Sequence, residues 1–400
     1  MVICHIWDAD YPWDIRVEKV CQSLQKKHQV HLVCRNAKRL PRHEVLDGTA
    51  IHRLPCFPAW LGPFHDIMGF PVFFNPMWLH LIWSTVKQSK VELIVVRDIP
   101  LALTAAVVAR WFKIPLLLDL AENYPAMLED RLLYTPTSAF GRIARNPWLA
   151  GVVEKTVLGM VDHIIVVVEE SRDRLLRMGV DAARITIVSN TPPIDRWQGA
   201  ETGTAQAADD GLHLVYLGNL DGSRGIDTAI RAVAVIKAQG RQARLSIIGT
   251  GPNIDQYREL VRSLGVSEQV AITGRLEFSK VEAIMGQANV GLIPHYGTGA
   301  WNTTIPNKLF DFMSMGKPVI VSSVRPTERI VQATQCGLVF KERDHEDLAA
   351  AMATFEDRGV REQYGRRGKA AFISRHNWTV DERVLFESVE RVMAAGRQNH

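Results

Sequence analysis

Lys308 and Asp311 place a fixed positive charge and a carboxylate acceptor on one short predicted helix. Pro306 suits the first position of this helix, because the N–H that proline lacks would have no partner there. The first amides of a helix are unpaired and carry a partial positive charge, so this end predicts a seat for a phosphate. Asp311 would accept hydrogen bonds from nearby hydroxyl groups. The alternative, an ordinary surface pair of Lys308 and Asp311 at three-residue spacing, stays open.

The flanking residues set the limits of this helix. Thr303 or Thr304 is expected to cap the first turn with its side-chain oxygen. Gly316 is expected to end the helix after Met315, because glycine readily takes the left-handed conformation. The apolar run 319–321 then predicts a buried parallel strand.

A second glycine-rich stretch, Tyr216–Gly225, reads YLGNLDGSRG. Gly218 and Gly222 follow a predicted strand, and their backbone amides can approach an oxyanion closely. Arg224 can reach a phosphate with its fork of donors. The stretch predicts a phosphate contact, with a tight turn carrying a solvated arginine as the alternative.

The strand end at Ile248–Pro252, IGTGP, is read either as a structural turn or as a ligand contact through Gly249. It is not the dinucleotide fingerprint, because GxGxxG would require a glycine where Ile254 stands, and this disfavours a nicotinamide enzyme. The chain also has no GxSxG, HExxH or P-loop lysine motif, which weakens the hydrolase, zinc-protease and nucleoside-triphosphatase readings.

Carboxylates and a histidine mark further strand ends. Glu122, in the stretch DLAENY from Asp119 to Tyr124, is placed to meet a substrate hydroxyl. For Asp119 itself, helix capping is the favoured reading. His295 follows a predicted strand at 290–293, where a hydrogen-bonding role and a catalytic role both stay open.

Strand and helix patterns alternate along both halves of the chain, which predicts two doubly wound α/β domains, Rossmann-like, with ligands beyond the carboxyl ends of the strands. Ser189–Gly211 lacks apolar periodicity and is the linker candidate, with Thr202–Ala208 expected to be poorly ordered. The strands are expected at 2–7, 30–34, 50–54, 93–96, 115–119, 163–168 and 185–188, and then at 212–217, 244–248, 270–272, 290–293, 319–321 and 338–340. The helices are expected at 14–28, 75–88, 99–112, 138–160 and 171–178, and then at 225–239, 253–264, 279–286, 306–315, 327–333, 346–355, 360–375 and 380–395.

Composition narrows the classes further. The chain has 400 residues and a net charge of +4, too weakly basic to argue for nucleic acid, and no nucleic-acid-binding signature is present. Its five cysteines are scattered without a CxxC pair, which argues against a disulfide framework or a zinc site and favours a reducing compartment. The strand-like start Met1–Trp7 has no basic leader, so we expect no signal peptide and a cytoplasmic location.

Aromatic and basic residues gather in the first half. The apolar stretch Ile67–Val86 is broken by glycine and proline, so we expect a loop and then a helix rather than a membrane span. Aromatic side chains beside basic ones suit a peripheral membrane contact, with an ordinary core and a solvated basic edge as the alternative. The aromatic residues are Trp60, Phe64, Phe70, Phe73, Phe74, Trp78 and Trp83, and the basic ones Lys26, Lys27, Arg35, Lys38, Arg39, Arg42 and Arg53.

Three motifs of the second half resemble one known family. YLGNLDGSRGIDTAIRAV, IIGTGP and IPNKLFDFMSMGKPVIVS together resemble the retaining glycosyltransferases of the GT-B fold, specifically glycosyltransferase family 4. The resemblance covers roughly Leu212–Ala351 well and Met1–Asn190 loosely. It implies transfer of a sugar from a nucleotide-sugar, with the donor mainly on the second domain and the acceptor on the first. The nucleotide-sugar is then a substrate, and neither a cofactor nor a metal is implied.

The resemblance also implies roles for particular residues. Asp311 matches the family's second glutamate, which holds the ribose hydroxyls, and Arg224 matches a basic residue on the donor diphosphate. Asn219 stands where a second arginine is common. The remaining residues expected to bind the donor are Gly218, Gly249, His295, Lys308 and the backbone around Thr303, Thr304 and Ile305. Glu122 and Arg224 are expected to be catalytic, and Asp98, Asp119 and Asn123 to lie on the acceptor side.

The chain departs from the family pattern at several positions. The family's first glutamate is Thr303 here, and Asp311 is one methylene shorter than glutamate. Ala121 stands at the histidine of the DxHE motif, and YPWDIR from Tyr11 to Arg16 replaces an N-terminal glycine pair. These changes bear on the sugar contacts and leave the phosphate seat intact.

We therefore predict a retaining hexosyltransferase that uses a UDP- or GDP-sugar and a sugar or lipid-linked acceptor in polysaccharide synthesis. Residues 1–190 would form the acceptor domain, completed by 378–400, and 191–377 the donor domain. The alternatives are a nucleotide-sugar epimerase of the same fold and a non-catalytic nucleotide-sugar-binding partner subunit, the latter suggested by Thr303 and Ala121. A membrane surface is a possible partner, and nucleic acid is not.

Overall fold

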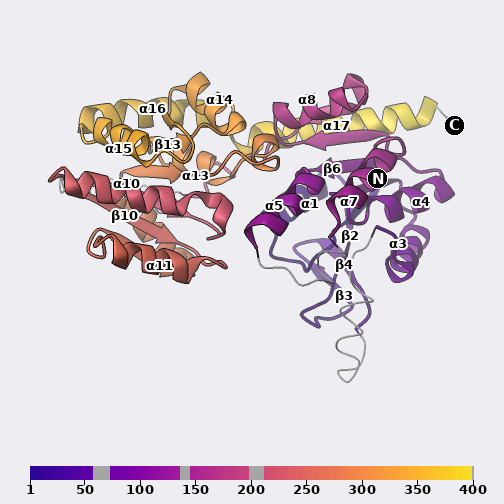
Figure 1. The fold of residues 1–400 in the computed structure, drawn as a ribbon. Helices are drawn as coiled ribbons and strands as arrows, with labels where there is room; N and C mark the ends of the chain where they lie inside the picture. The colour runs from indigo at the N-terminus through magenta and orange to yellow at the C-terminus, as the bar shows by residue number, and fades with distance from the viewer. Residues whose placement is uncertain (57–72, 136–144, 198–210, 399–400) are drawn as a thin grey trace. The chain divides into compact units, whose positions relative to one another are not determined.

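The computed structural model describes residues 1–56, 73–135, 145–197 and 211–398, which form two compact units (Figure 1). Unit 1 comprises Met1–Leu128, Ser138–Val188 and Glu382–His400. Unit 2 comprises Glu129–Thr137 and Ser189–Asp381. Each unit is built around a parallel sheet, which confirms the predicted pair of doubly wound α/β domains.

The sheet of unit 1 has eight strands in the order β3-β4-β2-β1-β5-β6-β7-β8. All neighbours pair in parallel except β3 and β4, which form an antiparallel edge. The central strands are continuous apolar runs, as expected for strands covered on both faces. The strands are β1 (Val2–Ile6), β2 (Gln29–Cys34), β3 (His43–Leu46), β4 (Thr49–Arg53), β5 (Leu93–Arg97), β6 (Leu116–Leu120), β7 (His163–Val166) and β8 (Ile185–Ile187).

Helices α3, α4 and α7 of unit 1 share one hydrophobic core with the sheet, and α4 packs against both of the others. Helix α1 packs outside that core, on β2 and β4. Proline and asparagine fix the starts of α3 and α7, since Asn75 and Asn146 each accept a hydrogen bond from a first-turn amide. The helices are α1 (Ile15–Gln25), α3 (Pro76–Ser89), α4 (Ala102–Phe112), α7 (Pro147–Leu158), α8 (Glu169–Arg177) and the short 3₁₀ turn η2 (Ala182–Arg184).

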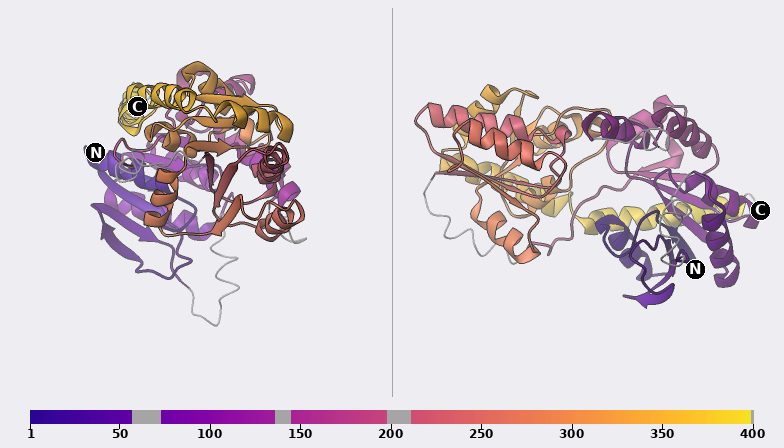
Figure 2. Two further views of the ribbon diagram at one scale, coloured as in Figure 1. Left: turned by 90° about the vertical axis from the view of Figure 1, so that its left-hand side faces the viewer. Right: turned by 60° about the horizontal axis from the view of Figure 1, so that its bottom comes forward.

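The sheet of unit 2 has six parallel strands in the order β11-β10-β9-β12-β13-β14, with helices on both sides (Figure 2). Its strands are β9 (Leu212–Leu217), β10 (Ala243–Ile248), β11 (Val270–Gly274), β12 (Val290–Ile293), β13 (Val319–Ser322) and β14 (Gly337–Phe340). Its helices are η4 (Gly222–Arg224), α10 (Ile226–Ala238), α11 (Ile254–Ser263), α12 (Phe278–Gln287), η5 (Trp301–Thr303), α13 (Lys308–Ser314), α14 (Arg325–Thr334), α15 (His345–Thr354) and α16 (Arg358–Ser374).

Two further helices, α5 (Tyr124–Tyr134) and α17 (Trp378–Gln398), contain residues of both units. The first nine residues of the expected linker, 189–197, are packed within unit 2: the Ser189 amide donates to Asp381, and Trp197 is only 2% exposed. Thr202–Ala208 lies outside the described residues.

The strand order of each sheet reverses at one place. In unit 1 the reversal lies between β1 and β5, and in unit 2 between β9 and β12. In open α/β sheets, ligands bind outside the carboxyl ends of the strands at such a reversal. The residues that follow these four strands are therefore the first place to look for a site.

The sequence predicted most elements but not all. The hairpin strand β3 was not expected, because its alternating residues are mostly exposed and leave no apolar run. The helix expected at 138–160 is found in part, as α7 from Pro147, while 138–144 lie outside the described residues. Helix α5, which precedes it, was not expected. Pro147 sits at a helix start, as it does in many helices, rather than inside one.

Candidate functional site

Two basic side chains meet at the strand reversal of unit 2. His295 lies two residues beyond β12 and is 1% exposed. Lys308, the first residue of α13, brings its ammonium to 3.2 Å from His295 Nε2. The same ammonium lies 3.9 Å from the centre of the Tyr216 ring on β9. Strands β9 and β12 and helix α13 thus place one cation beyond the two strands where the order reverses.

Gly218 leaves the room that this cation occupies. A Cβ at Gly218 would lie 3.0 Å from Lys308 Nζ, so any side chain there would press on the ammonium. Gly218 also has a φ of 145°, a conformation that other residues rarely adopt. The glycine therefore lets a backbone turn and a buried ammonium share one small space, which the sequence reading did not predict.

Arg224 comes from the same turn and joins this group. Its guanidinium lies 4.4 Å from the centre of the Trp301 ring, and its Nε donates to Asp221 at 2.9 Å. The Trp301 ring in turn packs against His295 in a tilted arrangement, with ring centres 4.2 Å apart and 51° between the ring planes. Arg224 and the region around α13, far apart in the sequence, therefore meet in one place as expected.

The pKa values of the group are set by burial and by its neighbouring positive charges. Burial lowers the pKa of His295 well below its usual value, and the charges of Lys308 and Arg224 lower it further. Burial and then the charge of Arg224 lower the pKa of Lys308 in the same direction. Within the described residues His295 Nδ1 is buried without a hydrogen-bond partner. An anion placed here would raise the pKa values of His295 and Lys308 again, and it would accept a hydrogen bond from His295 Nδ1.

Gly249, in the turn after β10, packs directly against the turn at Gly218. A Cβ at Gly249 would lie 1.8 Å from the carbonyl oxygen of Gly218, so only glycine fits. The Gly218 amide donates to the Ile248 carbonyl at 2.9 Å, and the Leu220 amide to that of Thr250 at 3.0 Å. The structural reading of IGTGP is thus realised, and a contact between Gly249 and a ligand stays a prediction.

The start of α13 differs from the expectation. The helix begins at Lys308 instead of Pro306, with Asn307 at the cap position and no side-chain cap. Thr303 does not cap it, because its hydroxyl donates to the carbonyls of Gly299 and Ala300 around η5. Thr304 and Ile305 connect η5 to α13 and are buried. The end at Gly316, with φ 65°, is as predicted.

Asp311 is held by a residue that the sequence reading did not single out. Trp197 Nε1 donates to Asp311 at 2.7 Å, and Arg196 Nε lies 3.5 Å from the same oxygen. Trp197 also packs its ring against Phe278, 5.3 Å between centres. Asp311 and Lys308 are both buried, so the alternative of an exposed surface pair is wrong.

Asn219 takes part in the turn itself. Its side-chain nitrogen donates to Asp221 at 2.9 Å, and its side-chain oxygen lies 3.0 Å from the Leu220 amide. Asp221 accordingly joins Asn219 and Arg224. Asn219 therefore orients the partner of Arg224, and its expected contact with the donor stays a prediction.

At the strand ends of unit 1, Asp119 forms a buried ion pair. Arg16 donates to both of its carboxylate oxygens, at 2.9 Å from Nε and 2.6 Å from Nη2. The helix-capping reading of Asp119 is therefore wrong. The arginine comes from YPWDIR, the stretch that replaces the glycine pair of the family.

Asp98 accepts the kind of backbone hydrogen bonds that the helix-capping reading assigned to Asp119. The amides of Ala121 and Glu122 donate to it at 2.9 and 3.1 Å. Asn123 starts the unexpected helix α5, and its carbonyl accepts from the Met127 amide. Asp98, Asp119, Glu122 and Asn123 are therefore neighbours in unit 1, whereas Arg224 belongs to unit 2.

Two carboxyl groups of unit 1 hold protons unusually well. Burial raises the pKa of Asp98 to about 6, and burial together with the charge of Asp98 raises that of Asp8 to about 7. Arg97 lies 3.5 Å from Asp98 and 3.7 Å from Asp119. In the described parts of the chain, Arg97 Nε and Nη1 and Trp7 Nε1 are buried without a hydrogen-bond partner.

Sequence reasoning missed Asp8, Arg16, Arg97, Trp197, Asp221 and Trp301 as site residues. Asp8 and Arg97 lie at the ends of β1 and β5, so the strand-end rule that singled out Asp119 would have found them. Trp197 had no such indication, because it lies at the edge of an aperiodic stretch.

The aromatic and basic set expected to face a membrane is not one surface. Trp78, on α3, is fully buried in the core, and Trp60, Phe64 and Phe70 lie outside the described residues. Lys26 on α1 pairs with Glu382, and Arg53 is buried beside Glu44. Over the ranges that the structure describes, no helix is long and apolar enough to cross a bilayer.

Two family models match the chain, one in each half. The model of the glycosyl transferase 4-like domain matches residues 14–191. The model of the glycosyl transferases group 1 matches residues 211–357. Trp197 lies between the two matched ranges.

Curated relatives resemble part of the chain. The putative colanic acid biosynthesis glycosyltransferase WcaL of Salmonella typhimurium is 29% identical over 180 residues, covering 45% of this chain and 41% of the relative. The GDP-mannose-dependent alpha-(1-6)-phosphatidylinositol monomannoside mannosyltransferase of Mycobacterium tuberculosis is 27% identical over 170 residues, covering 41% and 44%. In both cases the match spans less than half of the relative's length.

Solved structures share the fold over nearly the whole chain. Sucrose-phosphate synthase of Thermosynechococcus elongatus superposes with a TM-score of 0.76 at 18% identity, covering 99% of this chain and 100% of the other. HepE of Anabaena, solved in complex with UDP-glucose, superposes with a TM-score of 0.70 at 13% identity, covering 98% and 99%. These likenesses show the GT-B fold.

Proposed function

Because the chain belongs to the GT-B glycosyltransferases of the family 4 type, we propose that it moves a hexose-type sugar from a nucleotide-sugar to a sugar or lipid-linked acceptor. The observation that carries the proposal is the group of Arg224, His295 and Lys308 beyond β9 and β12. A diphosphate would add a second anionic partner for Arg224, which already pairs with Asp221, and would place negative charge beside Lys308. The UDP and UDP-glucose named for the HepE structures support a nucleotide-sugar as the donor.

The donor diphosphate would lie against the turn at Gly218, with Lys308 and Arg224 on its oxygens. In a retaining transfer the bond from the anomeric carbon to the phosphate oxygen breaks, and the acceptor oxygen bonds to that carbon on the same face. The acceptor hydroxyl gives its proton to the departing phosphate oxygen, so no protein base is required. Stabilising the charge of the departing diphosphate is then the main task of the protein.

A metal is not required by this scheme, because two cations already face the diphosphate. In the part of the chain that the structure describes, no group of three or more His, Cys, Asp or Glu side chains is arranged to hold a metal ion. We therefore propose that Arg224 and Lys308 do the work that a divalent cation does in other transferases. Activity that survives EDTA would agree with this assignment.

Asp311 is the proposed ribose partner. Its carboxylate is buried and held from one side by Trp197, which fixes its position on α13. An ordered acceptor loses less entropy when it binds a hydroxyl than a freely rotating one does. We place the ribose hydroxyls beside Asp311, one helical turn from Lys308.

The acceptor side is proposed for the strand ends of unit 1. The carboxyl groups of Asp98 and Glu122 would accept hydrogen bonds from sugar hydroxyls. The buried N–H groups of Arg97 and Trp7 would donate hydrogen bonds to sugar oxygens. Glu122 is proposed to touch the acceptor hydroxyl that reacts. Nucleotide, sugar and acceptor are to be identified by experiment.

Thermal-shift and calorimetric screens of UDP, GDP and ADP sugars test the donor site, followed by incubation of the best donor with membrane extract. We expect transfer to an extract component, with the anomeric configuration of the product read by NMR. Arg224→Ala should lower kcat/KM about 10²- to 10³-fold, the usual cost of losing one donor to a developing charge.

Arg258→Ala is the matched control, because Arg258 lies on α11 in the same unit and forms an ion pair with the exposed Asp255. Conversion of the donor without an acceptor would make the protein an epimerase. Donor binding without turnover in any extract would make it a partner subunit. Equal loss in both variants would remove Arg224 from the diphosphate site.

A further inference from the structure

Three neighbouring helices of unit 1 carry almost no negative charge. Helices α3, α4 and α7 lie on one side of the sheet, with α4 packed between the other two (Figure 1). Their only acidic residue is Glu154, and it is 1% exposed and paired with Arg174. The outward side of the three helices therefore presents no carboxylate.

The same outward side is basic. Lys87 and Arg110 lie in the last turns of α3 and α4, Lys90 and Lys113 follow those helices at their C-caps, and Lys155 is on α7. All five are exposed. Basic residues near a helix C-terminus favour that helix in any protein. The three helices and their C-caps carry five exposed basic residues and no exposed acid, and the exposed acids Glu92 and Asp162 follow α3 and α7.

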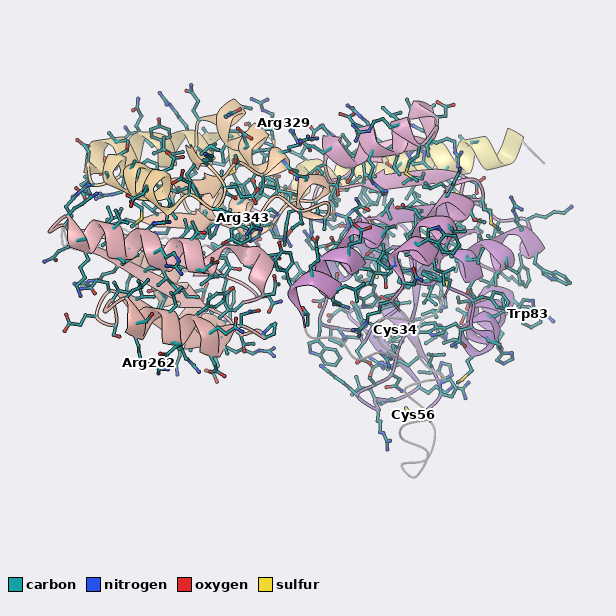
Figure 3. All side chains as sticks on the ribbon, viewed as in Figure 1. Cys34, Cys56, Trp83, Arg262, Arg329 and Arg343 are labelled. Carbon is teal, nitrogen blue, oxygen red and sulfur yellow. The ribbon has the colours of Figure 1, made fainter. Side chains whose placement is uncertain are left out.

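Large apolar side chains project from the same helices. Trp111 on α4 and Trp148 on α7 are each 74% exposed, and Val107, Leu149 and Val152 are also exposed on these two helices. On α3, Trp83 packs against Phe112 with Lys87 above its ring, and Figure 3 shows it at the outer edge of the unit. We call the outward side of α3, α4 and α7 the tryptophan face.

We propose that the tryptophan face docks on an anionic lipid surface. Tryptophan is the residue that favours the boundary between headgroups and acyl chains, and Lys and Arg beside it attract anionic headgroups. A second protein copy is less well matched, because this face would bring two sets of unpaired positive charge together. Of the aromatic and basic set expected from the sequence, the proposal uses Trp83, and its other residues are new.

The rest of unit 1 differs, which makes the assignment specific. Helix α8, next to α7, carries Glu169, Glu170 and Asp173, and α1 carries Glu18. The part of α17 that belongs to unit 1 carries Glu382, Glu387 and Glu390. A lipid surface would therefore select α3, α4 and α7 over these helices.

Sedimentation of the full chain with sucrose-loaded vesicles tests the proposal. We expect binding to mixed phosphatidylcholine–phosphatidylglycerol vesicles, weakening as salt is raised, and little binding to phosphatidylcholine alone. W111A/W148A should lower the partition coefficient at least tenfold. Trp13→Ala is the control, because Trp13 is also exposed, at 54%, but lies outside the face.

The charge of the face is tested separately with R110E/K155E. It should abolish the preference for anionic vesicles, whereas R231E/K280E, the same change on exposed residues of α10 and α12, should not. Absence of binding at low salt, or equal loss in test and control variants, overturns the proposal. So does a dimer in light scattering that W111A/W148A converts to monomer without vesicle binding. Donor binding, measured by calorimetry without lipid, reports separately on the proposed transferase.

Discussion

Both sheets reverse their strand order at one place, but the groups gathered there have opposite character. At the ends of β1 and β5 in unit 1, buried carboxyl groups have raised pKa values, about 7 in Asp8 and about 6 in Asp98. At the end of β6 the burial of Asp119 is outweighed by its ion pair with Arg16, so its pKa is lowered. At the ends of β9 and β12 in unit 2, His295 and Lys308 have lowered pKa values. In each unit the favoured charged form is penalised by burial.

The two places differ in the sign of the charge that burial penalises, which is negative in unit 1 and positive in unit 2. Unit 2 holds cations that an anion would stabilise, as a diphosphate would. Unit 1 holds carboxyl groups that hydroxyl donors or protons would stabilise, as a sugar would. One architecture therefore carries two kinds of buried charged group, and the few residues that follow each strand decide which kind it is.

The strongest test of the comparison is Asp119→Ala. It would leave Arg16 buried without its bidentate partner, and loss of one member of a buried pair costs about 3–5 kcal/mol. We expect urea unfolding of unit 1 at a lower midpoint, with donor binding to unit 2 intact. Asp173→Ala, which removes an exposed partner of Arg172, should cost about 1 kcal/mol at most. Loss of transfer with unchanged stability would instead make Asp119 part of the acceptor site.

Lys308→Met should separate binding from stability in unit 2. Methionine fills a similar volume without charge, so it removes the burial cost that lowers the pKa of Lys308. We expect a higher thermal midpoint together with about a tenfold to hundredfold loss of UDP or GDP affinity. Lys317→Met is a comparison, since the Lys317 ammonium is equally buried but donates to backbone carbonyls of Gly286 and Ala288. A variant that loses stability and keeps its affinity would refute the assignment of Lys308.

Donor affinity should fall as pH rises. The pKa of Lys308 is lowered in the free protein, and a neighbouring diphosphate would raise it again, so binding takes up a proton. For one proton the affinity changes by about tenfold per pH unit at most. Calorimetry in two buffers of different ionisation enthalpy measures the uptake directly. Lys308→Met should abolish it, and proton uptake that persists there would point to His295.

Trp197→Phe should have the smallest effect. It removes the indole N–H that donates to Asp311 but keeps most of the ring packed on Phe278. The expected loss is about 1 kcal/mol in binding of UDP or GDP. If Trp197 positions Asp311 for the ribose, the variant should discriminate less between a nucleotide and its 2′-deoxy analogue. An equal loss for both nucleotides would make Trp197 a purely structural anchor.

The sequence predicted the two sheets well because their strands are continuous apolar runs bounded by glycine and polar residues. It also predicted that Arg224 and the region around α13 lie close together, and the contacts through Trp301 and His295 confirm this proximity. It could not predict Trp197 on Asp311 or Arg16 on Asp119, because these pairs join residues 114 and 103 positions apart with no periodic pattern. The start of α13 was misplaced because the hydroxyl of Thr303 had two competing uses, a helix cap and the η5 turn.

Because Gly249 contacts Gly218, the turn after β10 and the turn after β9 cannot move independently. Nothing larger than hydrogen fits at position 249, so a substitution there must push the neighbouring turn toward the ammonium it shelters. Damage would then appear as poor recognition of the nucleotide, although the altered residue touches only backbone. A residue without a side chain thus sets the distance between the turn after β9 and the turn after β10.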